Sequence, residues 1–174
     1  MTMWVLEEGL TSLSNVSRIG VLQPNDGDIL EQIIDKGAKI IKDDPDSLPF
    51  IKKYADVRVV RRFLKGVISG EFEDFIILVF YNKENALSGA SLVSRGRPWY
   101  APEGVTFLNE ECSVAFQKGL GLSRAMAYVL EKRAGIDVKL LAFSNANTLN
   151  NKMLENTFEK HLGYSSYKTF YKEI

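Results

Sequence analysis

The sequence has very little of the two residue types that build disulfide frameworks and zinc sites. Its 174 residues include one cysteine and one histidine. A single cysteine excludes an intramolecular disulfide, and one cysteine with one histidine argues against a zinc site of the usual kind. We therefore expect no metal ion, and a reducing compartment suits such a chain.

The sequence also lacks an excess of charge of either sign and any long apolar segment. Its 22 Lys and Arg residues balance 22 Asp and Glu residues, so the formal net charge is +0. This balance argues against nucleic acid or an anionic membrane as a partner. No uncharged stretch approaches the ~20 residues of a membrane span. Glu7 and Glu8 stand where a signal peptide needs a basic and then an apolar run, and we expect a cytoplasmic protein.

The composition is that of a globular domain. Hydrophobic residues make up 45% of the chain and charged residues 25%, and there is no internal repeat. A chain of this length typically forms one domain. We predict a single domain over 1–174, with a helical N-terminal part at 1–70 and a strongly patterned core at 74–174.

The first third of the chain is irregular, with a helix in its middle. A short strand is expected at Trp4–Leu6, and a loop at Thr11–Arg18 because this stretch is rich in Ser and Asn. Asp28 is placed to cap a helix that ends at Asp43–Asp46. Helical spacing puts its isoleucines on one face: Ile29, Ile33, Ile34, Ile40 and Ile41.

A second helix is predicted over about Tyr54 to Leu64. Apolar spacing indicates that Val57, Val60 and Phe63 face inward. The arginines Arg58, Arg61 and Arg62 then form an outward basic face, which the nearby acids at 71–74 are expected to neutralise.

The remainder of the chain alternates strands and helices. The apolar run Asp74–Tyr81 is typical of a buried strand, and Ala86–Ser94 alternates as its partner should. The later elements are strands at Val105–Phe116, Val138–Phe143 and Tyr164–Tyr171 and helices at Ser123–Ala134 and Asn145–His161. The glycines Gly135 and Gly163 would end these helices. The order predicts a mixed α/β domain.

A glycine pair lies between the third strand and the helix that follows it. Gly119 and Gly121 permit a tight turn, and the amides of 117–122 would then point outward at a helix N-terminus. Such amides form a natural seat for a phosphate or pyrophosphate, and Lys118 and Arg124 could add charge. The loop is neither a Walker loop nor a dinucleotide fingerprint, which needs a third glycine. The alternative is a plain tight turn.

Taken together, three features resemble the GCN5-related N-acetyltransferase (GNAT) family. A long strand ends in a glycine loop that opens a helix, the strand Val138–Phe143 is followed by asparagines, and Phe158–Tyr164 is similar to the helix ending "Tyr-Glu-Lys-Leu-Gly-Phe" of the family. The resemblance covers the C-terminal ~100 residues. It implies a mixed, mostly antiparallel central sheet flanked by helices.

The resemblance also implies a role for acetyl-CoA as the acyl donor. The backbone at Cys112, Ser113 and Val114 would bind the pantetheine arm of coenzyme A, with Asn145 or Asn147 close to it. The pyrophosphate would be held by the amides of Gln117, Lys118, Gly119, Leu120, Gly121 and Leu122. The family transfers acetyl directly from the thioester to an amine, without a covalent enzyme intermediate.

The candidate general bases are Glu110 and Glu111 on the third strand. Side chains alternate across a strand, so only one of them faces the active side, where it could take an amine proton through water. The alternative is a solvated or salt-bridged pair at a sheet edge. Tyr164 could act as an acid or belong to the core. We expect Cys112 to be a small buried residue and not a nucleophile.

Three functions remain open at this stage. The leading hypothesis is an N-acetyltransferase that moves an acetyl group from acetyl-CoA to a small-molecule or protein amine. The alternative is a catalytically inactive protein of the same fold that serves as a binding or structural component, as some viral proteins do. Phe116 and Phe158 favour it, because they stand where the family motifs have Arg or Gln and Tyr.

The third hypothesis is a nucleic-acid-binding domain that uses the loop Arg95–Tyr100, and the zero net charge argues against it. The arginines and aromatic residues of this loop could also bind an acidic partner, or the loop could be a solvated hairpin tip. The exposed aromatics of this loop or of the last strand could pair with a second copy in a homodimer.

Overall fold

The computed structural model describes residues 2–5, 14–43, 53, 55–97, 102–117, 121–133, 138–143 and 160. Their strands form a six-stranded sheet in the order β1-β2-β3-β4-β5-β6. The first five strands are antiparallel to their neighbours, whereas β6 is parallel to β5. The bounds are β1 Thr2–Val5, β2 Val16–Val21, β3 Phe75–Asn82, β4 Leu87–Gly96, β5 Thr106–Ala115 and β6 Val138–Phe143.

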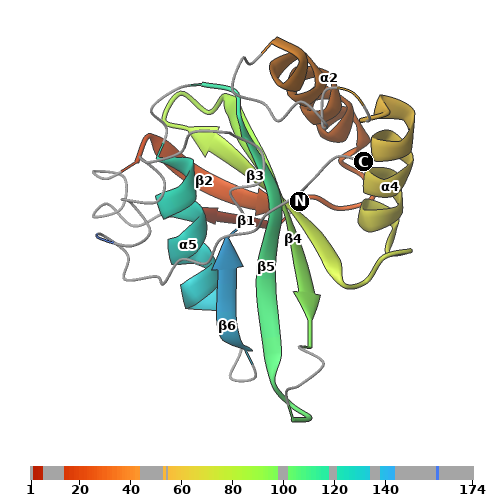
Figure 1. Cartoon of the computed structure of the whole chain (residues 1–174). Coiled ribbons are helices and arrows are strands. Elements are labelled where there is room, and N and C mark those ends of the chain that lie inside the picture. The colour runs from red at the N-terminus through yellow and green to blue at the C-terminus, as the bar shows by residue number, and fades with distance from the viewer. Residues whose placement is uncertain are drawn as a thin grey trace.

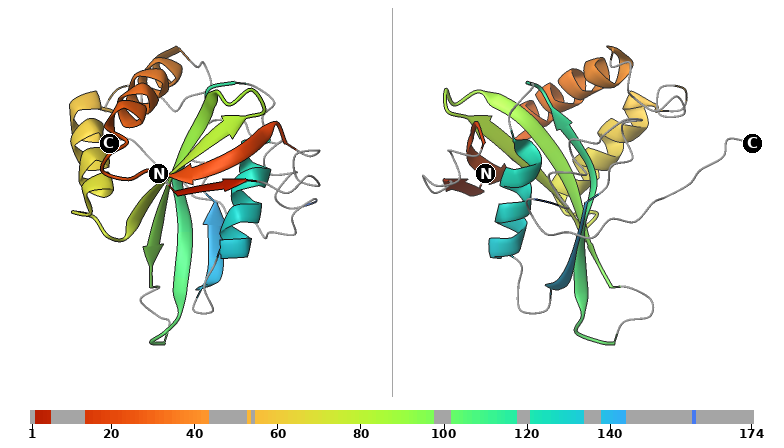
Figure 2. Two further views of the ribbon diagram at one scale, coloured as in Figure 1. Left: turned by 180° about the vertical axis from the view of Figure 1, so that it is seen from behind. Right: turned by 60° about the vertical axis from the view of Figure 1, so that its left-hand side comes forward.

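Three helices cover the two faces of this sheet within the described residues. They are α2 Gly27–Asp43, α4 Val57–Ser69 and α5 Leu122–Arg133. The helices α2 and α4 lie on one face and α5 on the other (Figure 1). Figure 2 shows the sheet between α5 and the α2–α4 pair. The expected mixed α/β class with a mostly antiparallel sheet is confirmed.

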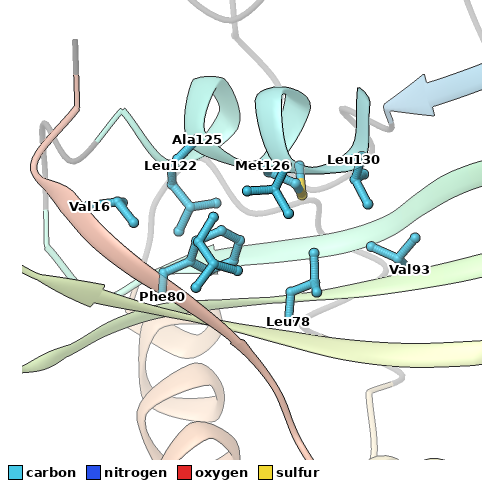
Figure 3. Packing of buried hydrophobic residues seen from close by; sticks show 10 residues of the cluster. Val16, Leu78, Phe80, Val93, Leu122, Ala125, Met126 and Leu130 are labelled. Atoms are coloured by element: carbon cyan, nitrogen blue, oxygen red, sulfur yellow. The ribbon is translucent and has the colours of Figure 1, made fainter. Parts of the chain in front are cut away.

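The strand β3 is apolar over most of its length, up to the polar Asn82 at its end, and helices cover both of its faces. Leu78 and Phe80 point toward α5, where they meet Leu122, Met126 and other buried side chains of that helix (Figure 3). The alternate residues Ile77 and Val79 pack against α2 and α4 in a second cluster. The core therefore has two halves, one on each side of the sheet.

Polar groups mark where the two N-terminal helices begin. Asp56 caps α4 by accepting a hydrogen bond from the Arg58 backbone N–H at 2.8 Å. Hydrogen bonds from the Arg58 side chain and backbone lower the pKa of the Asp56 carboxyl to about 2. The α2 helix begins at Asp26, whose carbonyl accepts from the Leu30 N–H at 3.1 Å. The prediction that Asp28 caps this helix was wrong, because Asp28 lies within its first turn.

Two further predictions for the N-terminal part were wrong. The expected loop Thr11–Arg18 overlaps β2. A register shift between Val16 and Arg18 interrupts the alternation of side chains along this strand, so the sequence pattern does not reveal it. The helix α4 runs on to Ser69 and buries Gly66 and Val67 near its C-terminal end. Its first turns consequently lie away from the core, and Val57 and Val60, predicted to face inward, are 38% and 42% exposed.

The basic face of α4 is neutralised by partners other than those expected. Glu31 of α2 accepts from Arg61 at 2.9 Å and from Lys65 at 2.8 Å, and Arg58 pairs with Asp56 at 2.8 Å. Hydrogen bonds from Lys65 and Arg61 lower the pKa of the Glu31 carboxyl. The pairs of Glu31 with Arg61 and Lys65 join α4 to α2 across their exposed sides.

The predicted strands of the core are confirmed at β3, β4, β5 and β6, and the short first strand at β1. The helix predicted at Ser123–Ala134 is α5. The predicted helix Asn145–His161, with Phe158, and the strand Tyr164–Tyr171 fall outside the described residues, apart from Lys160. Within the described part, no helix combines the length and the apolar character needed to cross a membrane.

The packing of α5 on the sheet predicts a large effect of a small side chain at Gly89. A Cβ there would collide with the Leu122 side chain and approach the Val114 carbonyl oxygen to 2.8 Å. We expect Gly89→Ala to lower the free energy of unfolding by about 1–3 kcal/mol, measured by urea denaturation. Gly27→Ala is the matched control, because a Cβ at Gly27 meets nothing within 4 Å. Equal stability of the two variants would contradict the described packing of α5.

Candidate functional site

The strand β5 loses its β6 partner halfway along its length. The parallel pairing runs from Thr106 opposite Val138 to Glu110 opposite Phe143. Beyond that point β5 continues to Ala115, paired with β4 on its other side. Within the described residues, no strand pairs with this stretch of β5 on the β6 side. The backbone there forms an edge to which an extended ligand can hydrogen-bond.

A β-bulge lies where this edge begins. Leu92 pairs with Cys112 and Val93 pairs with Glu110, so Glu111 is the extra residue of β5. A bulge of this kind changes the phase of side-chain alternation along the strand. Glu110 shares the α5 face with Val93 and is 2% exposed. Cys112 instead shares the α2–α4 face with Leu92, which packs against the cluster beneath these helices.

The Glu111 side chain is exposed and belongs to a small polar group. Its Oε1 atom accepts hydrogen bonds from Asn109 Nδ2 at 2.9 Å and from the Ser94 hydroxyl. Ser94 and Asn109 are directly opposite each other on β4 and β5. Glu110 and Glu111 are therefore not a solvated pair, because only Glu111 can meet a molecule in solution.

The Cys112 residue is exposed, and the prediction that it is buried was wrong. The bulge causes this difference, because it turns Glu111 and Cys112 in succession away from the α5 face. Although part of the residue is exposed, desolvation by the surrounding protein and then the charge of Glu110 raise the pKa of the Cys112 thiol to about 11. The thiol is neutral near pH 7, and a neutral thiol is a poor nucleophile.

Two other residues predicted to bind coenzyme A contact the core on opposite faces of the sheet. Ser113 contacts Met126 of α5, with 3.8 Å between Oγ and the sulfur. Val114 packs against the α2–α4 cluster on the opposite face. The Gln117 side chain accepts a hydrogen bond from Asn82 Nδ2 at 3.3 Å.

The glycine loop is described only at its end. Gly121 has a φ of +64°, a value that favours glycine. Its carbonyl accepts from the Ala125 N–H at 3.1 Å, so α5 begins directly after it. The Leu122 side chain is buried in the α5 core. The remaining predicted site residues, Lys118, Gly119, Leu120, Asn145, Asn147 and Tyr164, lie outside the described residues.

The sequence analysis did not single out Ser94, Asn109 or Lys36. Asn109 could have been found, because it lies two residues from Glu111 on one strand and therefore on the same face. Ser94 and Lys36 could not, because they reach the site through strand pairing and helix packing. The Lys36 ammonium lies 5.2 Å from the centroid of the Phe116 ring, next to the predicted glycine loop.

Comparison with known proteins shows that the fold of this chain is similar to that of solved structures. No family model matches the sequence, and no curated protein matches it. A possible acetyltransferase from Clostridium difficile has a TM-score of 0.63 at 12% identity, over 90% of this chain and 96% of that chain. A GNAT family acetyltransferase from Staphylococcus aureus has a TM-score of 0.55 at 13% identity, over 100% and 99%.

An aminoglycoside acetyltransferase from an uncultured soil metagenomic sample, in complex with sisomicin, has a TM-score of 0.54 at 13% identity, over 90% and 95%. At such identities the likeness concerns the fold alone. The chain has the fold of the GNAT acetyltransferases, and the expected fold class is confirmed.

The raised pKa of Cys112 predicts slow alkylation with an unusual pH dependence. Below a pKa of about 11 the thiol is protonated, so at pH 8 we expect about a hundredfold less thiolate than a free cysteine has. The rate of reaction with iodoacetamide, followed by mass spectrometry, should still rise linearly with hydroxide from pH 8 to pH 9.5. The rate for glutathione should level off. Glu110→Gln should speed the protein reaction, and a plateau near pH 9 would contradict the shift.

Proposed function

We propose that this protein is an N-acetyltransferase that moves an acetyl group directly from acetyl-CoA to an amine. The observation that carries the proposal is the open edge of β5, which begins at Glu111 and is followed by the N-terminus of α5. The GNAT fold of the chain supports the same reaction class by analogy. We further propose that the chain acts as a single domain in the cytoplasm, on a small-molecule or protein amine.

The proposed donor site uses mainly backbone groups. The pantetheine arm of acetyl-CoA carries amides, which can pair with the edge at Cys112–Val114 as an added strand would. The pyrophosphate would lie at the start of α5, against the amides of the loop that ends at Gly121 and Leu122. There the unpaired N–H groups and the helix dipole favour an anion. The neutral Gln117 side chain stays with Asn82 in this arrangement.

The proposed reaction needs a group that removes a proton from the amine. The amine nitrogen attacks the thioester carbonyl, a C–N bond forms, and the C–S bond then breaks to release the thiolate. We assign proton removal, through water, to Glu111, because it is exposed whereas Glu110 is 2% exposed. Tyr164 remains the proposed acid for the thiolate. Cys112 is not assigned an acyl-carrier role, because its neutral thiol is a poor nucleophile.

A second candidate function is a protein of this fold that binds a partner without catalysis. It is favoured by Phe116, which stands where the resembled motif has Arg or Gln and packs against the α2–α4 cluster. A loop without that side chain has less charge to offer to a pyrophosphate. Binding of acetyl-CoA decides between the two candidates.

Calorimetric titration with acetyl-CoA and with coenzyme A tests the donor site. We expect binding in the micromolar range, weakened at least about tenfold by Gly121→Val, because a side chain at a φ of +64° strains the backbone that approaches the pyrophosphate. Gly70→Val is the matched control, since Gly70 has a φ of +83° at the end of α4. No binding at millimolar ligand would refute the acetyltransferase proposal and favour the second candidate, a protein that binds a partner without catalysis.

Two isosteric variants distinguish the roles of Glu110 and Glu111. We expect Glu111→Gln to lower kcat/KM for amine acetylation about a hundredfold or more, because it removes the proton acceptor. Affinity for acetyl-CoA should stay the same. Thiol release from acetyl-CoA is measured with spermidine, a lysine peptide and an aminoglycoside as acceptors. Glu110→Gln is expected to change Tm more than rate. The reverse pattern would transfer the assignment to Glu110.

A further inference from the structure

Glu111 is held by two neutral donors that come from neighbouring strands. Asn109 Nδ2 donates to Oε1 at 2.9 Å, and the Ser94 hydroxyl donates to the same oxygen. Two hydrogen bonds to one oxygen fix the orientation of the carboxylate. Within the described part of the chain, the second oxygen takes part in no hydrogen bond or ion pair. It is therefore available to a ligand.

Glu111 also differs from Glu31 and Asp56, because among the described residues no cation pairs with it. Glu31 pairs with Arg61 and Lys65, and Asp56 pairs with Arg58. The ion pairs of the described residues include none to Glu111, although it is exposed. Hydroxyl and amide donors carry no net charge, so they leave the negative charge of the carboxylate uncompensated. Such a group attracts a cation.

The position of Glu111 connects this carboxylate to the proposed donor site. It is the first residue of β5 beyond the pairing with β6, so it lies where the open edge begins. Asn109 and Ser94 lie opposite each other on the pairing strands, on the α2–α4 face. A molecule that reaches Glu111 from this face would meet the end of a donor that extends along the edge toward α5.

We infer that Ser94 and Asn109 are positioning residues that orient the Glu111 carboxylate toward the protonated amine of the acceptor. The inference rests on the proposed acetyltransferase function. The fixed Oε1 holds the carboxylate in place while the other oxygen binds the ammonium. Once the amine has lost its proton, it attacks the thioester as described above. Ser94 and Asn109 act through Glu111 and need not touch the acceptor.

Steady-state kinetics of Ser94→Ala and Asn109→Ala test the inference with the same three amines. We expect KM for the amine to rise about tenfold in each variant, because a charge-assisted hydrogen bond is lost. The change in kcat should stay below about threefold, and affinity for acetyl-CoA should not change. Ser94→Thr keeps the hydroxyl and should restore KM. Ser69→Ala is the matched control, since it removes a hydroxyl that bonds the Gly66 carbonyl at 3.0 Å on α4.

Salt dependence supplies a second readout that a purely structural role would not move. Between 20 mM and 500 mM NaCl, KM for the amine should rise in the unaltered protein and stay nearly flat in Glu111→Gln, because salt screens an exposed ion pair. Wild-type KM in both Ser94→Ala and Asn109→Ala would overturn the inference. So would acetyl-CoA binding with no amine-dependent thiol release. Absence of acetyl-CoA binding overturns the proposed function itself, which distinguishes the two failures.

Discussion

The candidate site depends on one irregularity in the pairing of β4 with β5. The bulge at Glu111 shifts the alternation of side chains, so Glu110 stays buried beneath α5 while Glu111 and Cys112 face the other way. Within the described residues, the pairing of β5 with β6 ends at the same place. The change of side-chain face and the start of the backbone edge therefore coincide on the strand. A ligand along the edge and a molecule beside Glu111 would meet there, which a regular ladder would not permit.

Apolar packing holds the start of α5 on the sheet. Leu122 is 7% exposed in the core and lies directly over Gly89, where no side chain would fit. Asn82 fixes the start of the preceding loop, since it donates to Gln117 and accepts from the Ala86 N–H at 2.8 Å. The packing of Leu122 and the hydrogen bonds of Asn82 thus direct the helix N-terminus toward the end of the open edge.

Much of the fold could be predicted from the sequence, because burial on two faces leaves a strong pattern. The apolar run of β3 and the alternation of β4 identify their strands directly. Register shifts explain two of the predictions that failed: one at Val16 and Arg18 hid β2, and the bulge at Glu111 put Cys112 at the surface. Which glutamate is exposed could not be predicted either, since a bulge depends on the pairing of two strands. Ser94 joins Glu111 through that same pairing.

Although the chain has zero net charge, its exposed charged side chains differ in whether a group of opposite charge pairs with them. The cations of α4 at Arg58, Arg61 and Lys65 are each paired with a carboxylate, whereas the partners of Glu111 among the described residues are two neutral donors. A backbone edge can be kept by almost any sequence that keeps the fold, which fits neighbours that are only 12% or 13% identical. In the proposed reaction, selectivity for an acceptor would come from side chains that meet the edge. The exposed carboxylate of Glu111, held by Asn109 and Ser94, is the side chain to which we assign that role.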